Sequence, residues 1–253
     1  MLSRGISGAG RRVAGPYERK LTSLLELDGV FLDMYGTLTA GDRAAVESVC
    51  TEVVALTGVP LSPVELSVRW GVRYFAALEC CNDGQFCNLF EVEARTLRET
   101  MLELGVDLDP YPFARALTAY WRDPPLQPEA LDFLSKCKVP ICLVSNADRA
   151  DIEAALARHG IEIPYIVTSE DVRCYKPAAR IFAEALRRTG WRRDRVIHVG
   201  DSLHSDVGGA LAAGLRSGWV NRAHRIHDVG NHVPDYEFEN LRGLMALVTA
   251  AGK

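Results

Sequence analysis

Three short apolar runs of this sequence each lead into a polar residue that can take part in chemistry. The runs cover residues 30–32, 141–144 and 195–199, and the polar residues are Asp33, Ser145 and Asp201. Short apolar runs beside turn residues are typical of strands buried in a parallel sheet, and residues 124–221 alternate such runs with single helical patterns. Because ligands bind at the carboxyl ends of the strands of such a sheet, we expect these side chains to share one site.

The segment between the first and second of these strands has a different, purely helical pattern. Apolar residues recur at helical spacing from Val46 to Val54, and Ser62-Pro63-Val64-Glu65 combines an N-cap, a first-turn proline and a capping-box glutamate. Two further helices are expected over residues 91–104 and 113–121. We therefore expect an all-helical insert over residues 40–123.

Composition narrows the class of protein. The 29 Lys and Arg against 33 Asp and Glu give a net charge of -4, which favours neither nucleic acid nor an anionic membrane as a partner. No apolar run approaches the ~20 residues of a membrane span, and no secretory signal is evident, so we expect a cytoplasmic protein. The seven cysteines contain no C-x-x-C pair. Residues 1–26 could be a targeting peptide, but a frayed N-terminal extension is the favoured interpretation.

Further residues extend the strand-end pattern into motifs. They are Asp33-Met34-Tyr35-Gly36-Thr37, Ser145-Asn146, Lys176-Pro177, and Gly200-Asp201-Ser202 followed by Asp206. In this order and spacing they resemble the motifs of the haloacid dehalogenase-like (HAD) superfamily of hydrolases. The resemblance implies an α/β fold, with a Rossmann-like core of parallel sheet over residues 27–39 and 124–253. It also implies that residues 40–123 form a helical cap of the C1 type.

The resemblance implies a magnesium-dependent phosphatase that acts on a small phosphorylated metabolite. A phosphate ester is an anion, so attack by a carboxylate requires positive charge and hydrogen-bond donors beside it. Asp33 would be the nucleophile and form an aspartyl-phosphate, and Lys176 would hold nucleophile and phosphate together. The Mg²⁺ ligands would be Asp33, the backbone carbonyl of Tyr35, Asp201 and Asp206, and the phosphate would be bound by Thr37, Ser145, Asn146 and Lys176.

Tyr35 departs from the family pattern of the phosphatases, which have an aspartate there as acid and base. A phenol is a poor base near neutrality, and tyrosine at this place is typical of the family's 2-haloacid dehalogenases, in which halide leaves without a proton. A metal-independent dehalogenase is therefore an alternative, and so is a binding protein with altered catalysis. Asp201 with Asp206 favours the phosphatase, because these carboxylates would repel an anion unless a cation lay among them.

The acid or base that would replace the second aspartate is left open. The candidates are His204 in the metal motif and Arg73, Glu79 and Asn82 in the insert. The stretch from Tyr74 to Phe90 could select substrate or only form the core of the insert. The expected partner is a small phosphate ester, and the chain is expected to be a monomer or a homodimer.

Overall fold

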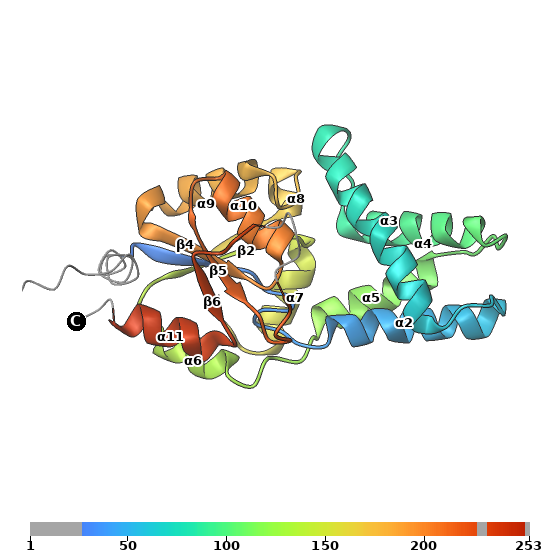
Figure 1. Ribbon diagram of the computed structural model, residues 1–253, viewed down its shortest axis with the longest axis horizontal. Helices are drawn as coiled ribbons and strands as arrows, with labels where there is room; N and C mark the ends of the chain where they lie inside the picture. Colours follow the sequence, from blue (N-terminus) through green and yellow to red (C-terminus); the bar gives the residue numbers. More distant parts are fainter. Residues whose placement is uncertain (1–26, 227–231, 251–253) are drawn as a thin grey trace, which may run out of the picture.

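The computed structural model describes residues 27–226 and 232–250, and its centre is a six-stranded parallel sheet (Figure 1). The strand order is β3-β2-β1-β4-β5-β6, and every neighbouring pair is parallel. The strands are β1 Gly29–Leu32, β2 Ile141–Ser145, β3 Tyr165–Thr168, β4 Val196–Gly200, β5 Arg216–Val220 and β6 Tyr236–Phe238. The predicted α/β fold with a parallel sheet is confirmed.

Helices cover both faces of the sheet because its strands alternate between two buried sides. Val30 and Leu32 face a core formed with α6 (Ala130–Lys136), α7 (Arg149–Arg158) and α11 (Leu241–Ala250). Phe31, between them, faces the opposite core with α9 (Ala179–Thr189) and α10 (Gly209–Ala212). The short helix α8 (Ser169–Val172) follows β3 directly. This double cover explains why the strands read as nearly continuous apolar runs.

Of the five helices between β1 and β2, the first four lie together beyond one end of the sheet (Figure 1). They are α2 Asp42–Thr57, α3 Pro63–Asp83, α4 Leu89–Glu103 and α5 Tyr111–Arg122, and we call them the helical segment. They share a core of their own, which includes Val53, Trp70 and Leu97. The predicted capping box opens α3, because Ser62 Oγ accepts from the Glu65 N–H at 3.2 Å and Glu65 accepts from the Ser62 N–H at 2.8 Å. The domain boundaries at residues 40 and 123 stay a prediction.

The end of the chain differs from the expected pattern. The helix expected from Asp206 begins as a π-helical turn over Leu203–Gly208 and continues as the short α10. Trp219 is buried in β5, and β6 and α11 lie beyond the alternating pattern of residues 124–221. Residues 1–26 and His227 lie outside the described residues. Over the ranges 27–226 and 232–250, no helix combines the length and the apolar character that a membrane span needs.

Candidate active site

Asp33 lies directly after β1, at the middle of the carboxyl edge of the sheet, and its side chain is buried. Its backbone N–H donates to the Val199 carbonyl of the neighbouring strand at 2.9 Å. The Oδ1 atom of Asp33 accepts from Lys176 Nζ at 2.7 Å and from Ser145 Oγ at 3.1 Å, whereas Oδ2 accepts from Thr37 alone among the described residues, at 3.3 Å. Burial raises the pKa of Asp33, and the Lys176 ammonium acts against this rise. One carboxylate oxygen is thus firmly held and the other only lightly.

Lys176 bridges two carboxylates at the carboxyl edge of the sheet. Its Nζ lies 2.7 Å from Asp33 Oδ1 and 2.6 Å from Asp206 Oδ1, and all three side chains are almost fully buried. Burial works against the charge of Lys176, but the attraction of Asp206 and Asp33 outweighs it and raises the pKa of Lys176. The ammonium therefore stays charged and fixes Oδ1 of Asp33.

Asp206 is held by three donors rather than left open for a metal. Its Oδ1 accepts from Lys176 and from His198 Nε2 at 2.9 Å, and its Oδ2 accepts from the Ser202 N–H at 2.9 Å. Burial alone would raise the pKa of Asp206, but Lys176 and His198 hold it well below its usual range. The geometry thus makes Asp206 the counter-ion of Lys176, and its predicted role as a metal ligand stays a prediction.

Asp201 is the carboxylate of this group that faces open space. Its side chain is 40% exposed, and Arg225 approaches it only to 4.0 Å. Partial burial, together with the charges of Asp206 and Asp33, raises the pKa of Asp201. Gly36, with φ +81°, lies against this side chain, and a Cβ atom there would come within 2.9 Å of Asp201 Cγ. A glycine is therefore required at position 36, both by the positive φ of the backbone and by the close approach of Asp201.

The carboxylate oxygens of Asp33, Asp201 and Asp206 lie within 4.8 Å of one another. Hard oxygen donors so grouped suit a divalent cation such as Mg²⁺. Lys176 already offsets much of the charge of Asp33 and Asp206, so the charge that remains uncompensated is chiefly that of Asp201. The donor set therefore fits a cation held mainly at Asp201 and Asp33.

Asn146 and Thr37, predicted to bind phosphate, are engaged within the protein. The Asn146 side chain accepts from the Lys176 N–H at 2.7 Å and donates to the Lys176 carbonyl at 3.2 Å. Thr37 is fully buried and donates to Asp33. Asn146 therefore holds the backbone of Lys176, and Thr37 helps to hold the side chain of Asp33.

Tyr35 turns its hydroxyl away from Asp33 and towards the helical segment. The hydroxyl donates to the backbone carbonyl of Trp121 at 2.8 Å, and the two rings meet edge to face at 4.9 Å. Burial raises the pKa of Tyr35 above its usual range. A phenol in this setting stays protonated, and its proton is committed to a carbonyl rather than to a leaving group.

A cavity of about 700 Å³ lies over these residues, between the sheet edge and the helical segment. Its floor includes Asp33, Ser145, Lys176 and Asp201, and its wall is mostly apolar. The wall includes Trp70, Tyr74, Leu78, Leu117 and Trp121. Such a cavity suits a small substrate with one polar end at the floor and an apolar body.

Glu93 is a wall residue that the sequence pattern did not single out. It is buried, and its Oε1 accepts from the Trp121 indole N–H at 2.8 Å. Its Oε2 has no hydrogen-bond partner within the described residues. Burial raises the pKa of Glu93 well above its usual range, which favours the protonated, neutral form of this carboxyl. Its helical spacing in α4 marks it only as an inward position, and no signal separates it from a core residue.

The four candidates for a replacement acid or base do not line this cavity. Arg73 pairs with Glu99 and Glu103 on α4, and His204 pairs with Glu79 at 3.0 Å. Asn82 hydrogen-bonds to the backbone of Tyr175. None of the four hydrogen-bonds to Asp33 in the part of the chain that the structure describes.

Comparison with known proteins gives relatives that span nearly the whole chain. A curated relative, the (S)-2-haloacid dehalogenase of Pseudomonas sp. strain YL, is 26% identical over 232 residues, which are 90% of this chain and 97% of the relative. The L-2-haloacid dehalogenase structure from Xanthobacter autotrophicus has a TM-score of 0.73 at 19% identity, covering 88% and 98% of the two chains. The structure of YfnB from Bacillus subtilis, a putative HAD-hydrolase bound to magnesium, has a TM-score of 0.72 at 20% identity, covering 88% and 99%.

These relatives overturn the prediction of a phosphatase acting on a small phosphate ester. The relative that aligns over 90% of the chain is a dehalogenase, which agrees with the alternative based on Tyr35. The prediction was wrong because it treated Asp206 as evidence of a metal, whereas Lys176 neutralises that carboxylate. The prediction of a hydrolase is confirmed, but the prediction that it hydrolyses phosphoric esters is not.

The family assignment rests on most of the chain. The family model of the haloacid dehalogenase-like hydrolases matches residues 27–214. This range includes Asp33, the helical segment, Lys176, Asp201 and Asp206. The protein therefore belongs to the haloacid dehalogenase-like hydrolases.

Proposed function

We propose that this protein hydrolyses the carbon–halogen bond of a small 2-haloacid and releases halide and a 2-hydroxyacid. The observation that carries the proposal is the difference between Asp33 and Tyr35, which lie two residues apart at the end of β1. Asp33 has a lightly held Oδ2, whereas the Tyr35 hydroxyl is committed to Trp121. A leaving group that needs no proton suits such a site, and halide is one. The activity named for the dehalogenase relatives supports the same substrate class.

In the first step, a lone pair of Asp33 Oδ2 forms a bond to C2 of the substrate, and the carbon–halogen electron pair leaves as halide. The product is an ester between Asp33 and the substrate. Lys176 and Ser145 hold Oδ1, which keeps the carboxylate oriented for attack through Oδ2. The apolar wall limits the water that could compete for the substrate.

In the second step, the oxygen of a water molecule adds to the Asp33 carboxyl carbon, and the bond to the substrate oxygen breaks. One proton of the water ends on the hydroxyl of the 2-hydroxyacid, and the other is released. Lys176 and Ser145 can stabilise the negative charge that develops on Oδ1 during this step. Asp33 is then regenerated with one oxygen from water.

Magnesium enters this proposal only as a ligand. Asp201, one oxygen of Asp33 and the backbone carbonyl of Tyr35 are the residues that would hold it, in keeping with the magnesium-bound YfnB neighbour. When bound, Mg²⁺ would supply positive charge that offsets Asp201 and attracts the substrate carboxylate. The displacement itself uses Asp33 and a departing halide, so we expect it to proceed in EDTA.

The proposal is tested by measuring chloride release from each enantiomer of 2-chloropropanoate, with Asp33→Asn as the matched variant. We expect release by the unaltered protein and none by the variant, because an amide is a far weaker nucleophile than a carboxylate. A single turnover in ¹⁸O-labelled water should place the label in Asp33. The proposal would be refuted if Asp33 carried no ¹⁸O after a single turnover, or if no chloride were released from any of a panel of chlorinated 2-haloacids.

A further inference from the structure

Tyr175, the residue before the active-site lysine, is anchored in the helical segment. Its side chain is fully buried in a cluster with Leu78 and Val92 of that segment. Its ring stacks on Phe86 at 5.2 Å, and its hydroxyl donates to the Cys87 carbonyl at 2.8 Å. A core residue of the helical segment is therefore supplied by the loop that carries Lys176.

Asn82, near the end of α3, fastens the backbone of the same residue. Its side-chain amide donates to the Tyr175 carbonyl at 3.1 Å, and its side-chain oxygen accepts from the Tyr175 N–H at 2.7 Å. Both polar backbone groups of Tyr175 thus bond to one side chain that lies 93 positions earlier in the sequence, and the carbonyl also accepts from the Ala178 N–H at 3.0 Å.

The next residue is fastened in the same way, but to the sheet. Asn146, after β2, accepts from the Lys176 N–H at 2.7 Å and donates to the Lys176 carbonyl at 3.2 Å. The Lys176 ammonium lies between Asp33 and Asp206. Two asparagines therefore hold adjacent residues, one from the helical segment and one from the sheet. Consecutive Cα atoms are only about 3.8 Å apart and the peptide between them is rigid, so Tyr175 and Lys176 move together.

We propose that Asn82 is a positioning residue for Lys176, so that docking of the helical segment through Asn82 and Tyr175 sets the ammonium against Asp33. The inference deepens the proposed function, because it concerns the lysine that orients the nucleophile. Misplacement of a reacting group by about 1 Å can cost on the order of 100-fold in rate. Docking of the helical segment over a substrate and correct placement of Lys176 then occur together.

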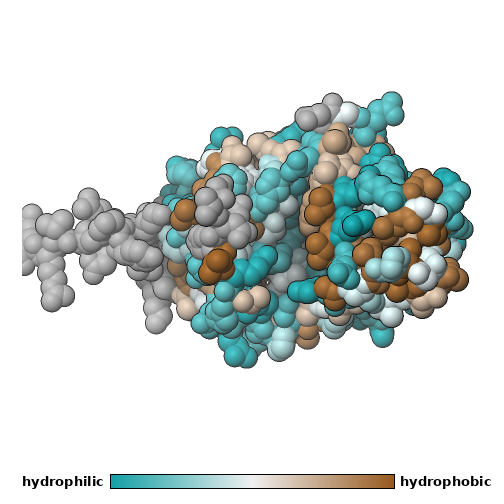
Figure 2. Space-filling model, turned by 45° about the vertical axis from the view of Figure 1, so that its right-hand side comes forward, coloured by the Kyte–Doolittle hydropathy of each residue, from teal (hydrophilic) through white to brown (hydrophobic). Residues whose placement is uncertain are grey.

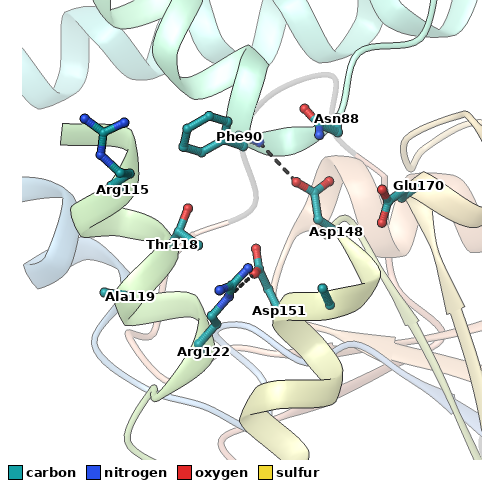
Figure 3. A pocket seen from close by; sticks show the side chains of 10 residues that line it. Asn88, Phe90, Arg115, Thr118, Ala119, Arg122, Asp148, Asp151 and Glu170 are labelled. Atoms are coloured by element: carbon teal, nitrogen blue, oxygen red, sulfur yellow. Dashed lines mark hydrogen bonds and ion pairs between the residues drawn. The ribbon is translucent and has the colours of Figure 1, made fainter. Parts of the chain in front are cut away.

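A separate contact keeps the helical segment docked when Asn82 is altered. The Asp148 carboxylate, at the start of α7, accepts from the N–H groups of Leu89 and Phe90 at 2.8 and 3.2 Å. Arg122 of α5 also pairs with Asp151 of α7 at 2.7 Å, and Figure 3 shows this pair and the bond from Phe90 to Asp148 beside a second cavity. Asn82→Ala is therefore expected to fold with the helical segment in place.

The experiment compares Asn82→Ala with Arg73→Gln, which lies on the same helix and loses only ion pairs to α4. Amide hydrogen exchange is read by NMR at Tyr175 and Lys176, and chloride release from 2-chloropropanoate gives kcat and KM. We expect Asn82→Ala to speed exchange at both amides by about tenfold or more, because local opening of the pair becomes easier. We also expect kcat to fall about tenfold with KM nearly unchanged, because the lysine is displaced rather than the substrate. Arg73→Gln should change neither.

Asn82→Asp provides the graded variant, because it still accepts from Tyr175 N–H but cannot donate to the Tyr175 carbonyl. Its exchange rates and kcat should lie between those of the unaltered protein and Asn82→Ala. Faster exchange at Tyr175 alone, with Lys176 protected and kcat unchanged, would overturn the inference. If the unaltered protein releases no chloride, the proposed function fails, and exchange at Lys176 still decides whether Asn82 positions the lysine.

Discussion

The hydroxyl of Tyr35 donates a 2.8 Å hydrogen bond to the backbone carbonyl of Trp121, so the nucleophile loop is tied to the last helix of the helical segment. Tyr35→Phe removes this bond and leaves a partly buried carbonyl without it, which should cost about 1 kcal/mol of unfolding free energy. Chloride release should persist within a few-fold, because the proposed reaction takes no proton from Tyr35. Urea unfolding and chloride assays measure the two effects. Loss of activity in a folded variant would instead give the hydroxyl a chemical role.

Lys176→Met should both inactivate and destabilise the protein. The substitution leaves Asp33 and Asp206 buried without their counter-ion, and removal of one partner from a buried ion pair typically costs about 3–5 kcal/mol. Lys136→Met is the matched control, since Lys136 pairs with Asp132 on the exposed face of α6 and such pairs contribute at most about 1 kcal/mol. Urea midpoints should therefore fall far more for Lys176→Met. Equal midpoints would contradict the view of Lys176 as the central counter-ion.

Glu93→Gln should stabilise the protein increasingly as the pH rises. Burial raises the pKa of Glu93 in the folded state, so the folded protein keeps a proton that the unfolded chain releases above the ordinary range of a glutamate. Stability of the unaltered protein therefore falls as pH rises from that range towards the raised pKa, and glutamine removes this loss. Urea unfolding between pH 4 and pH 8 measures the trend, with Glu52→Gln on the exposed face of α2 as control. A pH-independent difference would contradict a neutral Glu93.

Asp201→Asn should separate metal binding from catalysis. Asp201 carries the carboxylate charge that Lys176 does not reach, so its loss should weaken Mg²⁺ binding by more than about tenfold in calorimetry. Chloride release should survive both this substitution and EDTA, because Asp33 attacks without a metal. Activity that disappears in EDTA and returns with Mg²⁺ would show that the cation is required.

Much of the site could be predicted because its residues follow strands. Asp33, Ser145 and Asp201 are far apart in sequence, but parallel strands bring their ends to one edge, and the structure joins Ser145 Oγ to Asp33 at 3.1 Å. The helical pattern of residues 42–122 was equally local, since capping and spacing depend on neighbours in the sequence. These features need no knowledge of how the helical segment packs on the sheet.

The remaining features depend on tertiary contacts that no local pattern encodes. The sequence does not tell whether an acid such as Asp206 is neutralised by a metal or by a lysine, and this ambiguity led to the wrong reaction class. The pairing of Asn82 with Tyr175 arises only when a helix packs against a distant loop, and the bond from Trp121 to Glu93 only when α5 packs against α4. The three-residue β6 is too short to give a periodic signal. Exposed apolar side chains of the helical segment, such as Val68 and Phe75, likewise resemble core positions in the sequence. Figure 2 shows apolar surface on the side of the molecule where this segment lies.

The central place of β1 in the sheet has a consequence for how the protein is made. The ribosome delivers Asp33 early, but the strands on either side of it, β2 and β4, come much later in the chain. A nascent polypeptide that ends before β4 thus contains Asp33 but lacks Asp206, which helps to hold Lys176, and lacks the strand to which the backbone of Asp33 is bonded. We therefore expect Asp33 to become oriented for attack only after β4 and Asp206 have been made.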